Sequence, residues 1–290
     1  MKQYNAIVED ILNYHKKLSS NRTDIKTIGT FGTRMEFDMV DGFPLLTTKF
    51  VNFRAIVAEL LWFLSGSTNN EDLKALGTNI WSPWALETGE LGPIYGEQWT
   101  NWNNKGINQI SELIENLISN PSSRRHIVTG WNPEVVPNEK YTPQENVVMG
   151  KAALPACHTM MQFYTRPLTE SEMEELGDGE QTHALQCQLY QRSADMFLGV
   201  PYNIASYSLL LHMVARATNM VPEKFIWVGG DTHVYENTIE QLEIQLRRKE
   251  YPLPKLEFLT DNTNIFNYKV EDIKVKDYKA HPKLTAKPAV

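Results

Sequence analysis

One cysteine occupies a position from which a side chain could act as a nucleophile. Cys157 ends the apolar stretch LPAC and precedes a run that is typical of a β-strand. A lone cysteine is most often a small buried hydrophobe, and this motif alone leaves that interpretation open. A nucleophilic cysteine needs cationic neighbours, because they favour the thiolate over the thiol. His158 is a poor source of that charge, since successive side chains of a strand point to opposite faces.

Four arginines in non-helical settings form a second candidate group. Arg22 follows a polar turn, Arg124 and Arg125 precede the β-branched run 126–131, and Arg192 closes the run 184–192. Single arginines are usually solvated or ion-paired at the surface, and that alternative stays open for each. A guanidinium can also donate two parallel hydrogen bonds to a phosphate. Several of them converging on one phosphate would bind a nucleotide monoester.

Two further segments carry groups that could recognise a base or a sugar. Asn203 opens the helical run 203–218, where capping the helix is the ordinary role of an asparagine. Its amide could instead present one acceptor and two donors to a base edge. The segment GGDTHVY (residues 229–235) contains Asp231 and Thr232, which we expect to cap a second long helix over 232–248. Its two glycines would permit close approach to that helix N-terminus.

Composition excludes several classes of protein. The 290 residues carry 28 Lys plus Arg and 35 Asp plus Glu, a net charge of −7, which argues against a strong non-specific nucleic-acid binder. Two cysteines exclude a disulfide-rich scaffold. No apolar run reaches the roughly 18–20 residues of a membrane helix, and the N-terminus lacks the apolar stretch of a signal peptide. We therefore expect a soluble cytoplasmic protein without a membrane partner, and no metal ion.

Helices and strands are interspersed without a regular βαβ rhythm. Helical periodicity is present over residues 4–18, 54–65, 109–118, 203–218 and 232–248, and strand-like runs cover 126–131, 158–165 and 184–192. The acidic segment 169–182 is interpreted as a solvated loop or a short helix over a hairpin. Glu59 is unusual because it lies within an otherwise apolar helix, where burying a carboxylate is costly. The pattern predicts one α+β domain over residues 1–290 rather than a doubly wound sheet.

Seven segments of the chain resemble the thymidylate synthase and deoxypyrimidylate hydroxymethylase family, both in their residues and in their order along the chain. They are DGFPLLTTK (41–49), ELLWFLSG (59–66), LGPIYGEQW (91–99), SRRHIVTGW (123–131), CHTMMQFY (157–164), QLYQRSADMFLGVPYNIASY (188–207) and GGDTHVY (229–235). The resemblance spans nearly the whole chain. It implies an α+β fold with a large mixed β-sheet flanked by helices, and a homodimer packed sheet against sheet. It also implies reductive methylation of dUMP to dTMP with 5,10-methylenetetrahydrofolate, through a covalent cysteine adduct, with release of dihydrofolate.

The resemblance assigns catalytic roles to residues of this sequence. Cys157 matches the nucleophile that adds to C6 of dUMP, and Glu59 matches a proton-relay carboxylate. Tyr95 matches a residue near C5 that helps to remove the C5 proton. Asn203 matches the residue that hydrogen-bonds N3–H and O4 of uracil. The complete catalytic set that it implies is Cys157, Glu59, Tyr95, Asn203, Asp195 and Arg192.

The resemblance also implies two binding surfaces. The substrate phosphate would contact Arg22, Arg192 and Ser193, together with Arg124 and Arg125 of the partner subunit. His233 and Tyr235 match the binders of the deoxyribose 3′-hydroxyl, and Asp195 and Asn203 complete the substrate site. The folate site that it implies consists of Ile80, Trp81, Trp84, Leu154, Asp195, Leu198, Gly199, Tyr202 and the C-terminal Val290, which would close over the ligands and exclude water.

Several departures from the family pattern keep alternatives open. Ala156 stands directly before the cysteine where the family usually has proline. The segment from Trp81 to Trp84 lacks the usual carboxylates, and residues 133–150 and 168–183 resemble insertions relative to short bacterial members. The alternative enzyme is a deoxyuridylate hydroxymethylase, in which water replaces hydride; Asn203 argues against the deoxycytidylate version. A non-catalytic nucleotide-binding or RNA-binding homologue is the alternative from another class.

Overall fold

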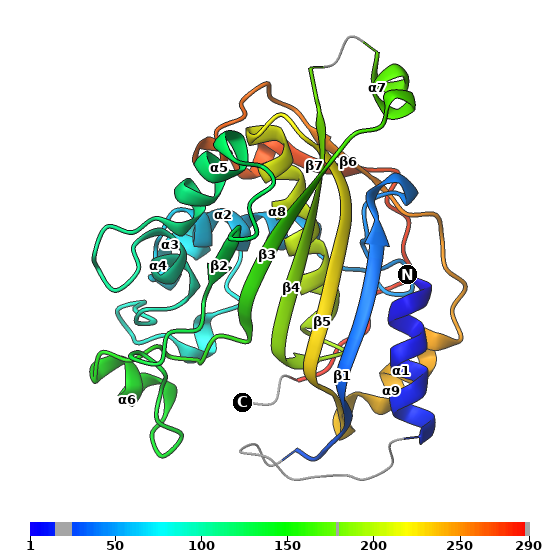
Figure 1. Ribbon diagram of the computed structural model, residues 1–290. Coiled ribbons are helices and arrows are strands. Elements are labelled where there is room, and N and C mark those ends of the chain that lie inside the picture. Colours follow the sequence, from blue (N-terminus) through cyan, green and yellow to red (C-terminus); the bar gives the residue numbers. More distant parts are fainter. Residues whose placement is uncertain (15–24, 178–179, 288–290) are drawn as a thin grey trace.

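The computed structural model describes residues 1–14, 25–177 and 180–287. Two predicted site residues, Arg22 and Val290, lie outside them. The main sheet has five strands in the order β1-β5-β4-β3-β2 (Figure 1). Only the β4–β5 pair in this sheet is parallel, so the sheet is mixed as predicted. The strands are β1 (Thr27–Asp38), β2 (Ile127–Thr129), β3 (His158–Pro167), β4 (His183–Asp195) and β5 (Val221–Tyr235).

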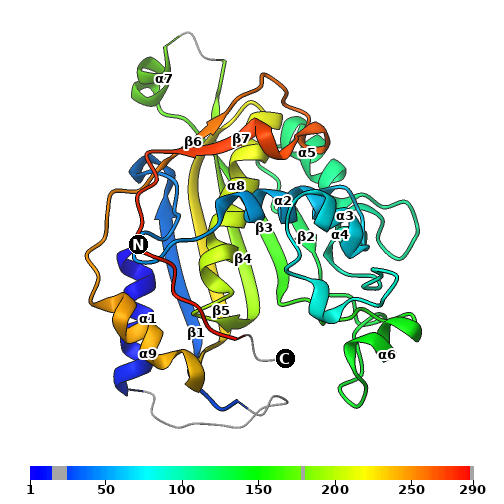
Figure 2. The same cartoon turned by 180° about the vertical axis from the view of Figure 1, so that it is seen from behind.

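Helices α2 and α8 lie behind the sheet in Figure 1 and in front of it in Figure 2. Among the described residues, no helix covers the opposite face of β3, β4 and β5. The helices are α1 (Lys2–Tyr14), α2 (Phe53–Leu64), α3 (Asn70–Ala75), α4 (Tyr95–Thr100), α5 (Gln109–Ser119), α6 (Pro143–Val148), α7 (Glu170–Leu176), α8 (Val200–Ala217) and α9 (Ile239–Leu246). A small second sheet pairs β6 (Lys255–Phe258) with β7 (Ile273–Lys276). None of the helices in the described ranges has the length and apolar character needed to cross a bilayer.

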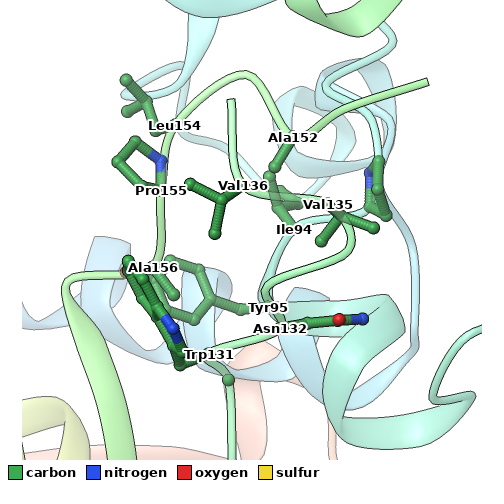
Figure 3. A pocket seen from close by; sticks show the side chains of 12 residues that line it. Ile94, Tyr95, Trp131, Asn132, Val135, Val136, Ala152, Leu154, Pro155 and Ala156 are labelled. Carbon is green, nitrogen blue, oxygen red and sulfur yellow. The ribbon is translucent and has the colours of Figure 1, made fainter. Parts of the chain in front are cut away.

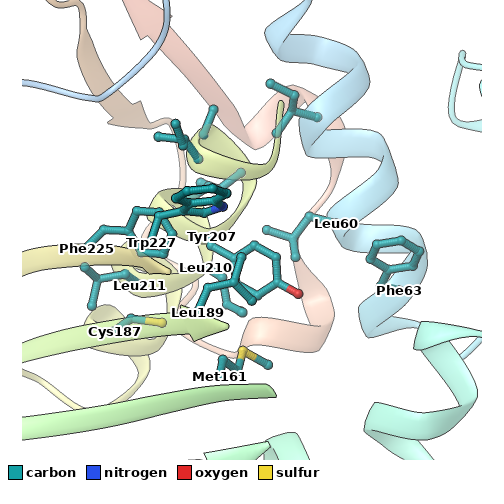
Figure 4. Packing of buried hydrophobic residues seen from close by; sticks show 14 of the residues in the cluster. Leu60, Phe63, Met161, Cys187, Leu189, Tyr207, Leu210, Leu211, Phe225 and Trp227 are labelled. Atoms are coloured by element: carbon teal, nitrogen blue, oxygen red, sulfur yellow. The ribbon is translucent and has the colours of Figure 1, made fainter. Parts of the chain in front are cut away.

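The core lies between the main sheet and the two long apolar helices (Figure 4). Leu189 of β4 and Met161 of β3 face Tyr207 of α8, and Leu60 approaches the same cluster from α2. Cys187 is fully buried here, and burial raises the pKa of its thiol. The two cysteines therefore differ in environment, because Cys157 is only half-buried.

Strand alternation explains why one sheet face is covered and the other is not. Along β4, buried Leu185, Cys187 and Leu189 alternate with half-buried Gln186 and Gln188. The first set faces the helices, and the second set lies on the face that those helices leave uncovered. A polar but half-buried strand face of this kind suits contact with another surface.

The segment GGDTHVY lies on strand β5 and not at the start of a helix. The predicted helix over 232–248 is therefore wrong in its first part, and α9 begins only at Ile239. Pairing with β1 on one side and β4 on the other holds this segment extended, which overrides the local capping pattern. A Cβ atom on Gly230 would lie 2.9 Å from the Arg192 carbonyl oxygen, so the glycine permits close strand approach rather than a helix N-terminus.

Helix α8 begins three residues earlier than the sequence pattern predicts. Its first residue is Val200, Gly199 is the N-cap, and Pro201 is accommodated in the first turn. Asn203 therefore does not cap this helix, so the capping interpretation is wrong. Its amide is left to interact with other side chains.

Two other predicted helices are confirmed closely. Helix α2 starts after Asn52, whose side chain accepts a hydrogen bond from the backbone of Ala55, and the chain leaves the helix at Gly66 with φ +78°. Helix α5 starts after Asn108, whose side chain accepts from Ile110 and Ser111.

The acidic segment 169–182 includes the short helix α7, as one of its two interpretations predicted. Thr169 and Glu172 form a capping box at its start. Arg166 of β3 donates hydrogen bonds to Glu172 at 2.6 Å and to Glu223 of β5 at 2.5 Å. These contacts attach the segment to the end of the sheet, and Arg166 lowers the pKa of Glu172 to about 2.

Candidate active site

Cys157 lies directly before β3 and is held from two directions. Its backbone N–H donates to the hydroxyl of Tyr95, the first residue of α4, at 2.8 Å. Its carbonyl oxygen accepts from the backbone N–H of Arg192 in β4 at 2.9 Å. Strand β4 and helix α4 therefore fix the position of the sulfur-bearing residue.

The guanidinium of Arg192 supplies a cation beside this sulfur. Its Nε donates to the Ala156 carbonyl oxygen at 2.8 Å, and its Nη2 donates to the Pro155 carbonyl oxygen at 3.0 Å. Nη2 also lies 3.7 Å from Sγ of Cys157. A guanidinium is charged at all relevant pH values and stabilises a thiolate at this distance. The structure thus brings together the predicted nucleophile and Arg192, one of the three predicted arginines within the described residues.

Arg124 and Arg125 are not brought to this cysteine within one chain. Both are exposed and precede the edge strand β2. Ile127 pairs with Gln162 of β3, which is five residues beyond Cys157. At about 3.3 Å per residue, the two arginines lie roughly 20 Å from the sulfur. Within one chain they therefore do not contact this cysteine.

A small cavity lies against the loop that leads to the cysteine (Figure 3). Leu154, Pro155 and Ala156 form one side of it, and Tyr95 and Trp131 contribute from other elements. This cavity contains Leu154 of the predicted folate set but none of the predicted phosphate or base ligands. It therefore adjoins the nucleophile loop without being the substrate site.

Glu59 of α2 accepts a hydrogen bond from the indole of Trp81, with Nε1 to Oε1 at 2.7 Å. Burial raises the pKa of this carboxyl group to about 7, and the bond from Trp81 partly opposes that rise. A carboxyl group with this pKa exchanges a proton near neutral pH. Glu59 is thus unusual both in its position within an apolar helix and in the raised pKa of its carboxyl group.

Tyr95 connects the cysteine to the aromatic cluster around Trp81. Its ring centroid lies 4.9 Å from that of Phe63 and 5.1 Å from that of His158. Burial, followed by the nearby Cys157, raises the pKa of the Tyr95 hydroxyl, so the phenol stays protonated. Burial lowers the pKa of His158 to about 4. The neutral His158 is therefore not the cation beside Cys157.

Asn203 is oriented by a buried residue that the sequence analysis did not select. The indole Nε1 of Trp227 donates to Oε1 of Gln191 at 2.9 Å, and Nε2 of Gln191 donates to Oδ1 of Asn203 at 3.0 Å. An indole N–H can only donate, so Trp227 fixes which end of the Gln191 amide faces Asn203. Gln191 lies inside the family segment 188–207. A polar residue at a buried position of a strand was the feature of the sequence that could have identified it.

The parallel register of β4 and β5 brings the remaining predicted substrate residues together. Ser193 pairs with Asp231, and Asp195 pairs with His233. Nδ1 of His233 lies 2.9 Å from Oδ1 of Asp231, and this hydrogen bond lowers the pKa of Asp231. The ring of Tyr235 meets that of His233 edge-on, with centroids 5.1 Å apart.

Asp195 lies at the end of β4, next to the start of α8. Its Oδ1 accepts from the backbone N–H groups of Phe197 at 2.8 Å and Leu198 at 3.2 Å. Both bonds end on Oδ1, which leaves the second carboxylate oxygen to accept from a ligand. Burial raises the pKa of Asp195 against the effect of these bonds. Gly199 and Tyr202 follow in the next turn of chain.

Lys49 is a second residue that the sequence analysis did not select. Its Nζ donates to the Phe197 carbonyl oxygen and lies 3.6 Å from the centroid of the Phe197 ring. The side chain is buried, which lowers the pKa of its ammonium group to about 7. A lysine within the otherwise apolar and hydroxyl-bearing stretch 43–51 was the signal for it.

Trp84, Ile80 and Tyr202 of the predicted folate set differ in their surroundings. Trp84 is half-buried, with its ring centroid 5.9 Å from that of Trp81, whereas Ile80 is exposed. Tyr202 is half-buried near Glu59 and hydrogen-bonds to the backbone of Asn52, and burial raises the pKa of its hydroxyl. Trp81 and Trp84 thus form an aromatic wall next to Glu59 of α2.

Comparison with known proteins decides the family. The family model described as thymidylate synthase matches residues 2–290. The chain belongs to the thymidylate synthase family. It is 49% identical over 289 residues to the thymidylate synthase of Francisella philomiragia subsp. philomiragia, covering 98% of this chain and 100% of that protein. It is also 49% identical over 284 residues to the thymidylate synthase of Francisella tularensis subsp. holarctica, covering 97% of this chain and 98% of that protein.

Membership of the thymidylate synthase family confirms the resemblance drawn from the seven segments. The family and the names of these relatives support a methyltransferase, and they do not favour the hydroxymethylase alternative. The thymidylate synthase family uses a folate co-substrate and dUMP. Several quoted family segments meet near Cys157: α2, α4 and β5 carry one each, and the segment 188–207 runs from β4 into the start of α8.

Proposed function

We propose that this protein is a thymidylate synthase that converts dUMP to dTMP, with 5,10-methylenetetrahydrofolate as the one-carbon donor and dihydrofolate as the second product. One observation carries this proposal beyond family membership. The Arg192 guanidinium lies 3.7 Å from Sγ of Cys157 while it is bonded to the two preceding carbonyl groups. This arrangement prepares a thiolate within a half-buried site.

The thiolate of Cys157 attacks C6 of the pyrimidine. The new S–C6 bond forms as the electron pair of the C5–C6 double bond moves toward C5 and O4, so that C5 becomes nucleophilic. Arg192 favours the thiolate before the attack and, with Ser193, faces the phosphate of the same substrate. Tyr95 keeps its own proton and holds the loop through the Cys157 N–H, so it positions the nucleophile. Its help in removing the C5 proton stays a prediction.

Asn203 recognises uracil by the two groups of its amide. Its Nδ2 donates to O4, and its Oδ1 accepts from N3–H while also accepting from Gln191. Cytosine reverses this donor and acceptor pattern and would leave buried polar groups without partners. The Trp227–Gln191 pair keeps the amide in this orientation.

Glu59 serves as the proton carrier. Its pKa of about 7 means that both protonation states are populated at neutral pH, as an efficient general acid and base requires. A protonated Glu59 stabilises the negative charge that develops at O4 during the attack of the thiolate. His233 and Tyr235 bind the deoxyribose 3′-hydroxyl from β5.

The residues around Trp81 and Asp195 fit a reduced folate. When bound, this co-substrate supplies the one-carbon unit and the hydride. Trp81 and Trp84 offer aromatic surface for its ring system, and the Asp195 oxygen that is not bonded to Phe197 and Leu198 suits the N–H groups of a pterin. Leu154, Leu198, Gly199 and Tyr202 complete this surface. Val290 remains a prediction, and so does the cytoplasmic location.

A homodimer completes the phosphate site. The face of β3, β4 and β5 that α2 and α8 leave uncovered carries half-buried polar and apolar side chains, among them Gln162, Gln188 and Ile226, which suits packing against the same face of a second copy. Exposed Arg124 and Arg125 lie at the β2 edge of the sheet, where they are able to reach the phosphate bound to the other chain. Arg22 is predicted to join Arg192 there.

The product of the reaction tests the proposal. Purified protein is incubated with dUMP and 5,10-methylenetetrahydrofolate, the nucleotide is identified by mass spectrometry, and dihydrofolate formation is followed by absorbance. We expect dTMP and dihydrofolate in equal amounts. A hydroxymethyl nucleotide without dihydrofolate would support the hydroxymethylase instead. Binding of dUMP by both the parent and Cys157→Ala, without turnover by either, would support the non-catalytic homologue.

A further inference from the structure

The segment 133–150, which resembles an insertion and is called the extra segment below, contains α6 and is stabilised by its own side chains. Thr142 and Glu145 form a capping box at the start of α6. The buried Asn146 accepts from the Asn138 N–H at 2.8 Å and donates to the carbonyl oxygens of Asn138, Tyr141 and Thr142 at 3.0–3.2 Å. Buried polar groups that are bonded this fully restrict a segment to one conformation. The segment is therefore a rigid support rather than a loose loop.

The side chain of Gln144 in α6 connects this segment to the turn that carries Trp84. Nε2 of Gln144 donates to the carbonyl oxygens of Pro83 at 3.1 Å and Ala85 at 3.4 Å. These two residues flank Trp84 at the end of the short 3-10 turn Ser82–Trp84. The contact joins residues that are 59 to 61 positions apart in the sequence.

The turn that Gln144 holds has few bonds of its own. Its backbone bonds at 3.1 Å run from Ser82 to Asn79 and from Trp84 to Trp81. Ser82 also accepts from the side chain of Asn70 at 3.1 Å. The two hydrogen bonds that Gln144 donates add fixation on the carbonyl side of this turn, where Pro83 and Ala85 flank Trp84.

The position of this turn sets the geometry of the proposed folate site. Trp84 packs edge-on against Trp81, and Trp81 donates to Glu59. We propose that Gln144 is a positioning residue that fixes the Trp81–Trp84 wall, so that the extra segment determines folate affinity and not nucleotide affinity. This inference rests on the proposed function, because it takes the aromatic wall to be the folate site.

The Gln144 contact is separate from the nucleotide machinery. Gln144 bonds to the backbone of the 3-10 turn, whereas Cys157 is held by Arg192 and Tyr95. The base of the segment does approach the nucleophile loop, because Val135 and Ala152 line the cavity beside Pro155 (Figure 3). A change confined to the Gln144 side chain leaves that base intact.

Two substitutions of Gln144 test the donor function. Gln144→Glu keeps the shape of the side chain but replaces the donor with an oxygen that the two carbonyl groups repel. Gln144→Lys restores a donor. Lys140→Ala, an exposed change in the same segment, is the matched control. Folate affinity is measured in two ways: as KM in steady-state assays, and as the Kd of a folate for the protein–nucleotide complex by tryptophan fluorescence.

We expect Gln144→Glu to raise the folate KM and Kd about 3- to 10-fold, the range that loss of a typical hydrogen bond gives. The KM for dUMP and the thermal midpoint should stay close to those of the parent, and Gln144→Lys and Lys140→Ala should resemble the parent. An unchanged folate Kd in Gln144→Glu would overturn the inference, as would equal losses for folate and dUMP. A parent protein that forms no dTMP would overturn the proposed function itself.

Discussion

Arg192 and Cys157 are joined twice, once through the backbone and once through the side chains. The Arg192 N–H donates to the Cys157 carbonyl oxygen at 2.9 Å, while Nη2 lies 3.7 Å from Sγ. The same guanidinium is bonded to the carbonyl groups of Pro155 and Ala156. A guanidinium fixed in this way cannot move away from the sulfur without disrupting the loop that carries Cys157. Thiol reactivity and loop geometry are therefore coupled.

Replacement of Arg192 by alanine should make Cys157 less reactive. Without the guanidinium, less of the thiol is ionised at neutral pH, and we expect alkylation by iodoacetamide at pH 7 to slow by about 10-fold. Mass spectrometry of the modified peptide measures this rate, and the buried Cys187 provides an unreactive internal reference. Arg34→Ala, at an exposed arginine of β1, is the control. An unchanged alkylation rate in Arg192→Ala would show that the cation does not activate the thiol.

The raised pKa of Glu59 predicts how stability depends on pH. The folded protein holds this proton up to about pH 7, whereas the usual pKa of the carboxyl group is 4.5. Between these values the folded state binds more protons than the unfolded state, so the parent loses stability as pH rises. Glu59→Gln removes this dependence. We expect the free energy of unfolding of the parent to fall, relative to the variant, by on the order of 3 kcal/mol between pH 4.5 and 7.

Urea unfolding of both proteins between pH 4.5 and 8 measures this difference. Above about pH 7 the carboxyl group is charged in both states, so the difference should become constant. A difference that instead grew in favour of the parent as pH rises would mean that Glu59 is a stabilised carboxylate in the folded protein.

Asn203→Asp should shift substrate preference toward deoxycytidylate. The new side chain still accepts from Gln191, because the Oδ1 position is unchanged, but its other oxygen can no longer donate to O4 of uracil. That oxygen suits the amino group of cytosine. We expect the ratio of kcat/KM for dCMP over dUMP to rise by at least about 10-fold. If the ratio stayed at the parent value, recognition of the base by this amide would be refuted.

Mixing two inactive variants should restore activity if subunits share the phosphate site. Arg125→Ala damages the site of the other chain, and Cys157→Ala damages its own site. In a heterodimer both changes fall in one site, and the second site is intact. We expect up to about half of the parental activity per heterodimer, with each homodimer far lower. Heterodimers that are verified by mass spectrometry but inactive would contradict donation of Arg125 across the interface.

Much of the architecture follows from the sequence, because periodicity and caps act locally. The bounds of α2 and α5 are set by Asn52 and Asn108 before them, and the mixed character of the chain predicts the α+β class. The first part of the helix predicted over 232–248 fails because Asp231 and Thr232 resemble a cap only in isolation. Pairing with β1 and β4 holds the same residues extended. A single sequence does not contain that long-range contact.

In the site, too, local sequence features predict some residues, and long-range contacts decide the roles of others. Glu59 could be selected because a carboxylate in an apolar helix conflicts with its surroundings, and Cys157 because of its family segment. Gln191 and Lys49 were not selected, since their roles depend on Trp227 and Phe197, which lie 36 and 148 positions away. The roles of Arg124 and Arg125 depend on a second chain.

The parallel pairing of β4 with β5 has a consequence for how this protein can change over evolutionary time. Ser193 sits across from Asp231, and Asp195 from His233, in a single alignment of two strands. Deleting one residue within either strand would turn every following side chain to the opposite face and separate these pairs. Length changes are tolerable only beyond the strand ends, and the two segments that resemble insertions, 133–150 and 168–183, occur in such places, before β3 and between β3 and β4.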